Sequence, residues 1–247
     1  AWSDGSFSKT MQYDRFYDKR PIGIVAHLGS DEVTGLDLDD DGELKYTHGI
    51  ILATSPVGNF KMHSKNSESV ANVAGAAGHF IVCSNYELAA LDMGGLDKTE
   101  FLLTLATDNL ASKERAYGRK KPSTFDNSDW YIGSAGQWCK IVSNLSGNTT
   151  FLTNWLTNTQ LVGWDRRGVD ASVKATMIDA NHMMKVTADY YAWGSTQVIA
   201  TSSVALAAGN VTGRFICFGF SGTGNNFAYL DSQPNETTVW TYPIISF

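Results

Sequence analysis

Residues 130–138 constrain the fold of this chain more than any other segment, because an aromatic strand end runs directly into a capped helix. The segment reads W-Y-I-G-S-A-G-Q-W. Ser134 and Gln137 stand in the S-x-x-Q relation of a capping box, in which each side chain satisfies a backbone N–H group at the start of a helix. The sequence therefore predicts a helix that begins at Ser134. Apolar residues then follow at helical spacing and share one face: Trp138, Ile141, Val142 and Leu145.

Apolar patterns on either side of this helix predict strands and further helices. Short β-branched runs at residues 22–26 and 49–53 are typical of buried strands. A second helix is predicted from Asp97, which with Glu100 forms an N-cap and N3 pair, and another around residues 149–157. The middle of the chain is therefore predicted to be mainly helical.

The last quarter of the chain has strand and turn signals at short spacing, as in an antiparallel sheet. Pro243 interrupts the last of these runs, which suits an edge position or the beginning of a strand. We expect an α+β fold in which both chain ends meet in a common antiparallel sheet, with two or three helices in the middle. Residues 13–247 would form one domain and residues 1–12 an N-terminal arm. The predicted late strands cover residues 190–193, 198–208, 214–220 and 239–247.

Composition excludes several classes of partner. The net charge of −6 argues against a nucleic-acid partner, and the one dense basic cluster, residues 119–121, suits a solvated helix end. No apolar run approaches the about 20 residues that a membrane span requires, so we expect no membrane insertion. The chain starts A-W-S-D-G, without an initiator methionine or a signal-peptide pattern, which indicates a mature or trimmed product.

Cysteine usage argues against a disulfide scaffold. The chain has three cysteines, so at least one thiol is unpaired. Cys139 follows Trp138 on the predicted helix and Cys217 lies in an apolar run. We therefore expect buried free thiols, at Cys83 as well.

Four segments resemble blocks of one protein family, in the same order. Residues 130–138 resemble the W-Y-L-P-S-x-G-E-W signature of the Fibrobacter succinogenes major paralogous domain family, with Gly133 in place of the proline and Gln137 in place of the glutamate. The segments H-G-I-I-L-A from His48, Y-Y-A-W-G-S-T-Q from Tyr190 and Y-P-I-I-S-F from Tyr242 resemble its H-G-L-V-V-A, Y-Y-W-S-S-T-E and V-R-P-V-L-A-F blocks. The resemblance covers nearly the whole chain from about Met11 onward.

This resemblance implies a C-type lectin-like fold, which the family shares with formylglycine-generating enzymes and with the variable proteins of diversity-generating retroelements. The family is common in surface proteins and phage fibres of gut Bacteroidetes. In such folds the first and last strands pair, and the late loops form a display surface. The resemblance therefore implies binding through loops on a rigid scaffold.

The late segment contains the best candidates for ligand binding. Aromatic rings offer contact area at low entropic cost and amides offer both a donor and an acceptor, so the combination suits sugar faces and protein epitopes alike. Tyr191 and Trp193 are better explained as core residues, whereas Asn225, Asn226 and Tyr229 lie in a glycine-rich segment that predicts an exposed turn. The candidate ligand-binding residues are Tyr190, Tyr191, Trp193, Gln197, Asn225, Asn226 and Tyr229.

An acidic segment is the sharpest metal-binding motif. Asp37, Asp39 and Asp41 alternate before a glycine, as at the start of a calcium loop. However, a twelve-residue loop of the EF-hand type would close at His48, which does not replace the bidentate glutamate. Calcium is therefore a candidate cofactor, and a solvated acidic hairpin is the favoured alternative.

The histidines show no zinc-binding spacing and no C-x-x-C pair is present, so no zinc site is predicted. His48 and His79 adjoin apolar strands and are predicted to be packed and hydrogen-bonded. No G-x-S-x-G or Walker A motif is present either, and helix capping accounts for Ser134. The sequence predicts no catalytic residue.

The function that these patterns favour is a non-catalytic surface module, an adhesin or receptor-binding protein that recognises a glycan or protein receptor through loops of the last third. Its location would be extracellular, at the cell surface, or on a phage virion, and it could form oligomers. Three alternatives stay open: a retroelement-diversified variable protein, an enzyme related to formylglycine generation, and a structural fibre or pilus component.

Overall fold

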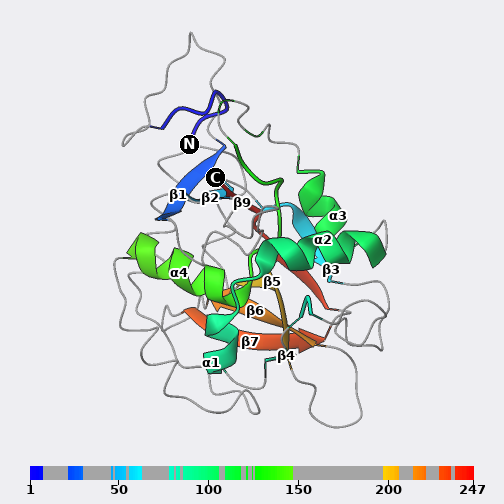
Figure 1. Ribbon diagram of the computed structural model, residues 1–247. Coiled ribbons are helices and arrows are strands. Elements are labelled where there is room, and N and C mark those ends of the chain that lie inside the picture. The colour runs from blue at the N-terminus through cyan, green and yellow to red at the C-terminus, as the bar shows by residue number, and fades with distance from the viewer. Residues whose placement is uncertain are drawn as a thin grey trace.

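The computed structural model describes the chain in sixteen stretches. Within them, helices combine with mainly antiparallel sheets (Figure 1), which confirms the predicted α+β class. The described residues are 1–7, 22–29, 46, 48–53, 56–62, 78–80, 82–83, 86–105, 109–117, 121, 124, 126–146, 197–205, 214–220, 228–234 and 237–247.

A three-stranded antiparallel sheet joins the two ends of the chain. Strand β2 (Gly49–Ala53) lies between β1 (Gly23–Leu28) and β9 (Ile244–Ser246). All five residues of β2 are buried, as the continuous apolar run predicts. The ring of Phe7 stacks on that of Phe247 at a centroid distance of 5.4 Å, and the two termini lie close together in Figure 1. The predicted meeting of the chain ends in a common sheet is confirmed.

A second sheet has the strand order β3-β8-β5-β6-β7, and β4 pairs with β5 in parallel. The predicted strand over residues 239–247 is divided at Pro243, which has no N–H group to donate to a ladder. Its two halves therefore enter different sheets, as β8 and β9. The strands of this sheet are β3 (Gly58–Lys61), β4 (Val82–Cys83), β5 (Gln197–Ala205), β6 (Arg214–Phe220), β7 (Ala228–Pro234) and β8 (Thr238–Thr241).

Four helices lie in the described ranges: α1 (Tyr86–Leu91), α2 (Gly95–Leu105), α3 (Leu110–Arg115) and α4 (Ala135–Ser146). Helix α4 starts directly after Ser134, as predicted. None of the helices in these ranges has the length and apolar character needed to cross a bilayer.

The predicted start of α2 at Asp97 is wrong by two residues. The backbone N–H of Lys98 already donates to the carbonyl of Gly94 at 3.2 Å, so the helical bonds begin before Asp97. The carboxylate of Asp97 lies instead against His79 Nδ1, at 2.9 Å. His79 lies 18 residues earlier in the chain. A capping pattern considers only residues within one helical turn, so it does not predict this partner. The helix predicted around residues 149–157 lies outside the described residues.

Helix α4 packs between the two sheets and contacts β1, β5 and β6 (Figure 1). Trp138, Ile141 and Val142 are completely buried, which confirms the predicted apolar face. Successive residues of β6 belong to different clusters, because side chains alternate across a strand. Ile216 packs in the cluster of α4, whereas Phe215 joins the cluster of α2 and α3.

Candidate functional site

The strand register places two of the predicted binding residues at one end of the second sheet. Gln197, the first residue of β5, lies opposite Phe220, which lies opposite Ala228 on β7. In the next row, Gly219 lies opposite Tyr229. The backbones of Gln197 and Tyr229 are therefore two strands and one position apart. We call this edge the β5–β7 end, defined by Gln197, Gly219, Phe220, Ala228 and Tyr229.

The connection that carries the two predicted asparagines also belongs to this end. Residues 221–227 join β6 to β7 between the paired positions Phe220 and Ala228. Tyr229 was predicted to lie in a glycine-rich turn, and that prediction is wrong, because its backbone pairs with Gly219 inside strand β7. The other predicted site residues lie outside the described residues: the ligand-binding candidates Tyr190, Tyr191, Trp193, Asn225 and Asn226, and the calcium candidates Asp37, Asp39 and Asp41.

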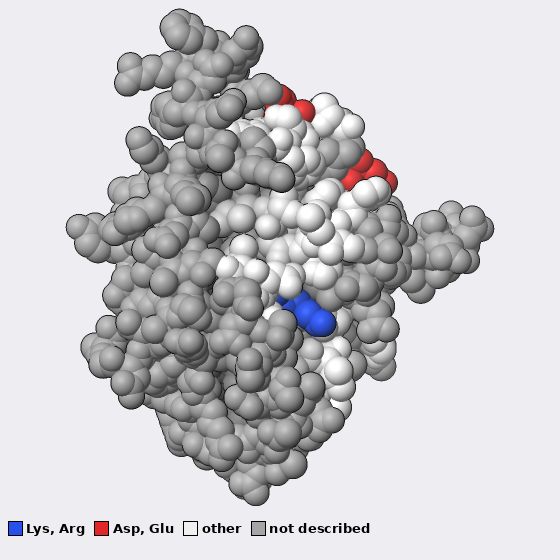
Figure 2. All heavy atoms as spheres, turned by 90° about the vertical axis from the view of Figure 1, so that its left-hand side faces the viewer, with Lys and Arg blue, Asp and Glu red and all other residues white. Residues whose placement is uncertain are grey.

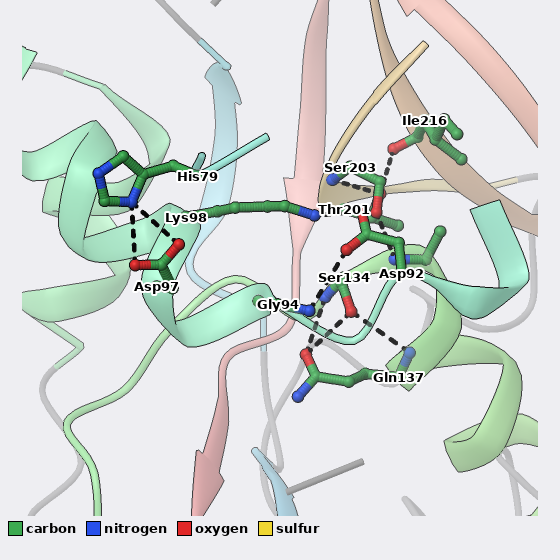
Figure 3. Close-up of polar contacts among 12 residues, drawn as sticks. His79, Asp92, Gly94, Asp97, Lys98, Ser134, Gln137, Thr201, Ser203 and Ile216 are labelled. Atoms are coloured by element: carbon green, nitrogen blue, oxygen red, sulfur yellow. Dashed lines mark hydrogen bonds and ion pairs between the residues drawn. The ribbon is translucent and has the colours of Figure 1, made fainter. Parts of the chain in front are cut away.

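A set of buried polar side chains, which we call the polar junction, lies between β5 and the starts of α2 and α4. Figure 3 shows these side chains gathered from the turn before α2, from α2 itself, from the start of α4 and from β5. Each is at most 2% exposed, so each polar atom must find its partner inside the protein. The polar junction comprises Asp92, Lys98, Ser134, Gln137, Thr201 and Ser203.

The capping box that the sequence predicts is present in this junction. The N–H of Ser134 donates to Gln137 Oε1 at 3.0 Å, and the N–H of Gln137 lies 3.4 Å from Ser134 Oγ. The amide nitrogen of Gln137 also donates to the hydroxyl of Tyr131 at 3.0 Å. Gln137 thus accepts the N–H of Ser134 without bringing a buried negative charge to the junction.

A bulge in β5 ties the sheet to the start of α4. The register of β5 against β6 shifts between Ala200 and Val204, and a bulge removes backbone groups from the ladder. The N–H of Ser202 donates instead to the carbonyl of Gly133 at 3.0 Å. The hydroxyl of Ser203 accepts the N–H of Ala135 at 2.8 Å. The bulge therefore supplies partners to the first turn of α4.

An ion pair closes the junction on the side of α2. Lys98 Nζ binds Asp92 Oδ2, and both residues are buried. The other oxygen, Oδ1, accepts the N–H of Gly94 at 3.3 Å, and the carbonyl of Asp92 accepts the N–H of Gly136 at 3.0 Å. Buried charges require such partners, because an unpaired one costs several kcal/mol. The ion pair thus joins α2 to the turn before it, and the backbone carbonyl of Asp92 joins this turn to α4.

Two glycines allow these segments to approach closely. A Cβ at Gly136 would lie 2.6 Å from the carbonyl oxygens of Ala90 and Asp92. A Cβ at Gly95 would overlap Gln137 Oε1 and lie 2.8 Å from the backbone nitrogen of Ser134. The junction is therefore a closely packed polar contact between backbone segments. Its hydrogen bonds hold these segments in position.

The three cysteines are free and buried, which confirms the prediction. Burial raises the pKa of the Cys83 thiol to about 12, with the Asp92 carboxylate adding to the rise and Lys98 opposing it. Burial also raises the pKa of Cys139 well above its usual range. A protonated thiol is a poor nucleophile and a poor metal ligand.

The histidines have different surroundings. His79 stacks on Phe101 at a centroid distance of 4.9 Å and binds Asp97, so its predicted packing and hydrogen bonding are confirmed. His48 is exposed, with its ring stacked at 6.3 Å from that of Phe247. In the part of the chain that the structure describes, no three His, Cys, Asp or Glu side chains gather as a metal site would require.

Asp92, Lys98 and Ser203 are not among the residues predicted from the sequence. The role of Ser203 could have been inferred from the polar run of residues 201–203, which interrupts an otherwise apolar strand. Polar residues in a buried strand need hydrogen-bond partners. For the ion pair we find no comparable signal in the sequence. Comparisons with protein-family models, with curated proteins and with solved structures returned no match to this chain.

Proposed function

We propose that this chain is a non-catalytic surface module of the C-type lectin-like class that binds a glycan or protein receptor at the β5–β7 end. The observation that carries the proposal is the register of β5, β6 and β7. It places the backbones of Gln197 and Tyr229 two strands and one position apart at the same end of the sheet. Asn225 and Asn226 lie in sequence between the paired residues Phe220 and Ala228. Amides and phenols are residue types that offer the donors, acceptors and apolar area that such ligands require.

The proposed lectin-like class is supported by the arrangement of the chain ends. Strands β1 and β9 both pair with β2, so strands from both ends of the chain share one sheet, although β2 separates the first strand from the last one. The polar junction supports the same view, because it ties β5 to the capped start of α4 through Ser203. A binding edge on a strand held in this way would be preorganised, which lowers the entropic cost of binding.

The net charge of the chain is −6. The described part of the face in Figure 2 is mostly uncharged, with acidic side chains at its upper margin and a basic group lower down. A location at the cell surface, or on a virion, belongs to the same proposal and follows from the family resemblance alone.

A matched pair of double variants tests the placement of the site. Asn225→Ala with Asn226→Ala changes the connection at the β5–β7 end. Asn210→Ala with Thr212→Ala changes residues 206–213, which join β5 to β6 at the opposite end, where Ala205 pairs with Arg214. Both chains would be examined with wild type on a glycan array and against labelled surface proteins.

We expect the control variant to bind as wild type does and the Asn225/Asn226 variant to bind at least tenfold more weakly, with equal melting temperatures. Loss of binding in the control variant alone would place the site at the other end of the sheet. Absence of any ligand for wild type in both assays would argue against a binding module and for a structural component.

A further inference from the structure

Glu114 on helix α3 is a carboxyl group with no contact to water. Its side chain is completely buried. The hydroxyl of Thr241, on strand β8, donates to Glu114 Oε1. Glu114 Oε2 is buried as well and has no hydrogen-bond partner among the residues that the structure describes. An ionised carboxylate needs several donors when it is buried, and Thr241 supplies one.

Among the described residues, the basic side chains near this carboxyl group bind other partners. Arg115, the next residue on α3, binds Glu100 of α2 and Asp129. Asp129 also binds Lys121 at 2.6 Å. The other basic residue of α3, Lys113, lies 5.4 Å from the ring centroid of Phe60. The nearby positive charges thus have other contacts.

The remaining titratable group in reach is a phenol. Tyr131 interacts electrostatically with Glu114, and its hydroxyl makes hydrogen bonds with Ser246 at 2.7 Å and with Gln137 at 3.0 Å. Strand β8 has the sequence T-V-W-T and carries no charge. Burial therefore raises the pKa of Glu114 to about 8, although the Thr241 hydroxyl opposes the rise.

We propose that Glu114 is a proton-dependent latch. The packing of α3 against β8 is stable while the buried carboxyl group is neutral. This packing loosens when the group ionises, because Thr241 is the one donor among the described residues that compensates the buried charge. Thr241 connects the latch to both sheets. Its carbonyl accepts the N–H of Val57 at 2.9 Å, next to strand β3. Two residues later Pro243 leads the chain into β9 of the other sheet. A change at Glu114 thus acts where the two sheets are joined.

The sign of the pH effect follows from the direction of the shift. The pKa of Glu114 is raised from 4.5 to about 8 on folding, so the folded chain holds a proton that the unfolded chain releases. The stabilising contribution is complete below pH 4.5 and is lost as the pH rises to about 8. In this window the titration of Glu114 lowers the folding equilibrium constant of the protein by up to about tenfold per pH unit.

Glu114→Gln tests the latch, because the amide keeps the shape and is neutral at every pH. Urea unfolding of wild type and of Glu114→Gln would be compared from mildly acidic to alkaline solution. We expect the stability of wild type relative to the variant to fall steadily across the window. Glu100→Gln is the control, because it makes the same chemical change at an exposed carboxyl group on α2. Parallel curves for wild type and Glu114→Gln would overturn the proposal.

Infrared spectroscopy of the folded chain follows the proton directly and does not require Glu114→Gln to fold. Wild type should show the stretching band of a protonated carboxyl group at neutral pH, lost with a midpoint near pH 8. Thr241→Val removes the only observed donor to the carboxyl group, so the midpoint should move to higher pH. A neutral-pH spectrum without this band, or a midpoint unmoved by Thr241→Val, would overturn the latch.

Discussion

The hydroxyl of Ser203 on β5 accepts the backbone N–H of Ala135, the first residue of α4, at 2.8 Å. The first N–H groups of a helix have no partner within the helix and are usually satisfied by a nearby cap. Here a strand 68 residues further along the chain supplies one of the acceptors. The start of α4 and the sheet of the proposed binding edge are therefore held together by a bond that is both a cap and a tertiary contact.

Ser203→Ala should destabilise the protein by about 1–3 kcal/mol, because it leaves the buried N–H of Ala135 without its acceptor. Ser202→Ala is the matched control. The hydroxyl of Ser202 is also buried but has no hydrogen-bond partner among the described residues, so its removal should be neutral or slightly stabilising. Urea unfolding of both variants measures the difference. Equal losses of unfolding free energy in the two variants would show that the hydrogen bond from Ala135 to Ser203 does not stabilise the protein.

Gly95→Ala should cost about 1–3 kcal/mol, because the added methyl group overlaps Gln137 and disturbs the capping box. Gly94→Ala is a control one residue away. The nearest atoms to its added Cβ lie 3.7 Å or more away, which is an ordinary contact distance. Thermal melts should therefore show a large shift for Gly95→Ala and little for Gly94→Ala, and the reverse order would contradict the packing described for the junction.

Lys98→Met should cost about 3–5 kcal/mol, because it leaves the buried carboxylate of Asp92 without its cation. Adding Asp92→Asn should recover more than half of this loss, since the uncompensated charge is then removed. A double-mutant cycle by urea unfolding measures the coupling. Lys121→Met is the control: its pair with Asp129 is half exposed, and such pairs contribute at most about 1 kcal/mol. A similar small loss for Lys98→Met would disprove the role of the buried pair.

Asp129 should give the opposite pH dependence to Glu114. The hydrogen bond from Lys121 lowers the pKa of Asp129 from 3.8, and Arg115 adds to this effect. Its contribution is therefore present above pH 3.8 and is lost as the pH falls through the lower pKa of the folded state. The carboxylate is half exposed, so the effect should stay below about 1 kcal/mol and shrink with added salt. The test is acid unfolding of wild type and of Asp129→Asn at low and at high salt. A stability difference that is larger than this, or that does not depend on salt, would contradict the prediction.

The three thiols should resist alkylation in the folded chain, because all three are buried and burial raises the pKa of Cys83 and of Cys139. Iodoacetamide followed by mass measurement should show no adduct in native buffer and three adducts in urea. The same samples can be assayed for copper. A cysteine labelled in the native state, together with bound copper, would favour the alternative of an enzyme related to formylglycine generation over a binding module.

Local patterns predicted the elements whose partners are close in sequence. The capping box of Ser134 and Gln137 spans three residues, so the start of α4 could be predicted to the residue. The prediction failed at Asp97, where the same logic applied, because His79 engages the carboxylate from another part of the chain. Tyr229 was misplaced for a related reason: glycines nearby indicate a turn, but pairing with Gly219 extends β7 over it.

The sequence by itself determined the α+β class, the apolar face of α4, the strands near both chain ends and the buried thiols. Each depends on a spacing of a few residues, or on the apolar character of a short run. Only the tertiary structure decided the bond from Ser203 to Ala135, the pairing of Asp92 with Lys98 inside the polar junction, and the burial of Glu114 against Thr241. The first and last of these bonds join residues 68 and 127 positions apart. No periodicity encodes such contacts, because they arise only when separate elements pack and exclude water from the polar groups between them.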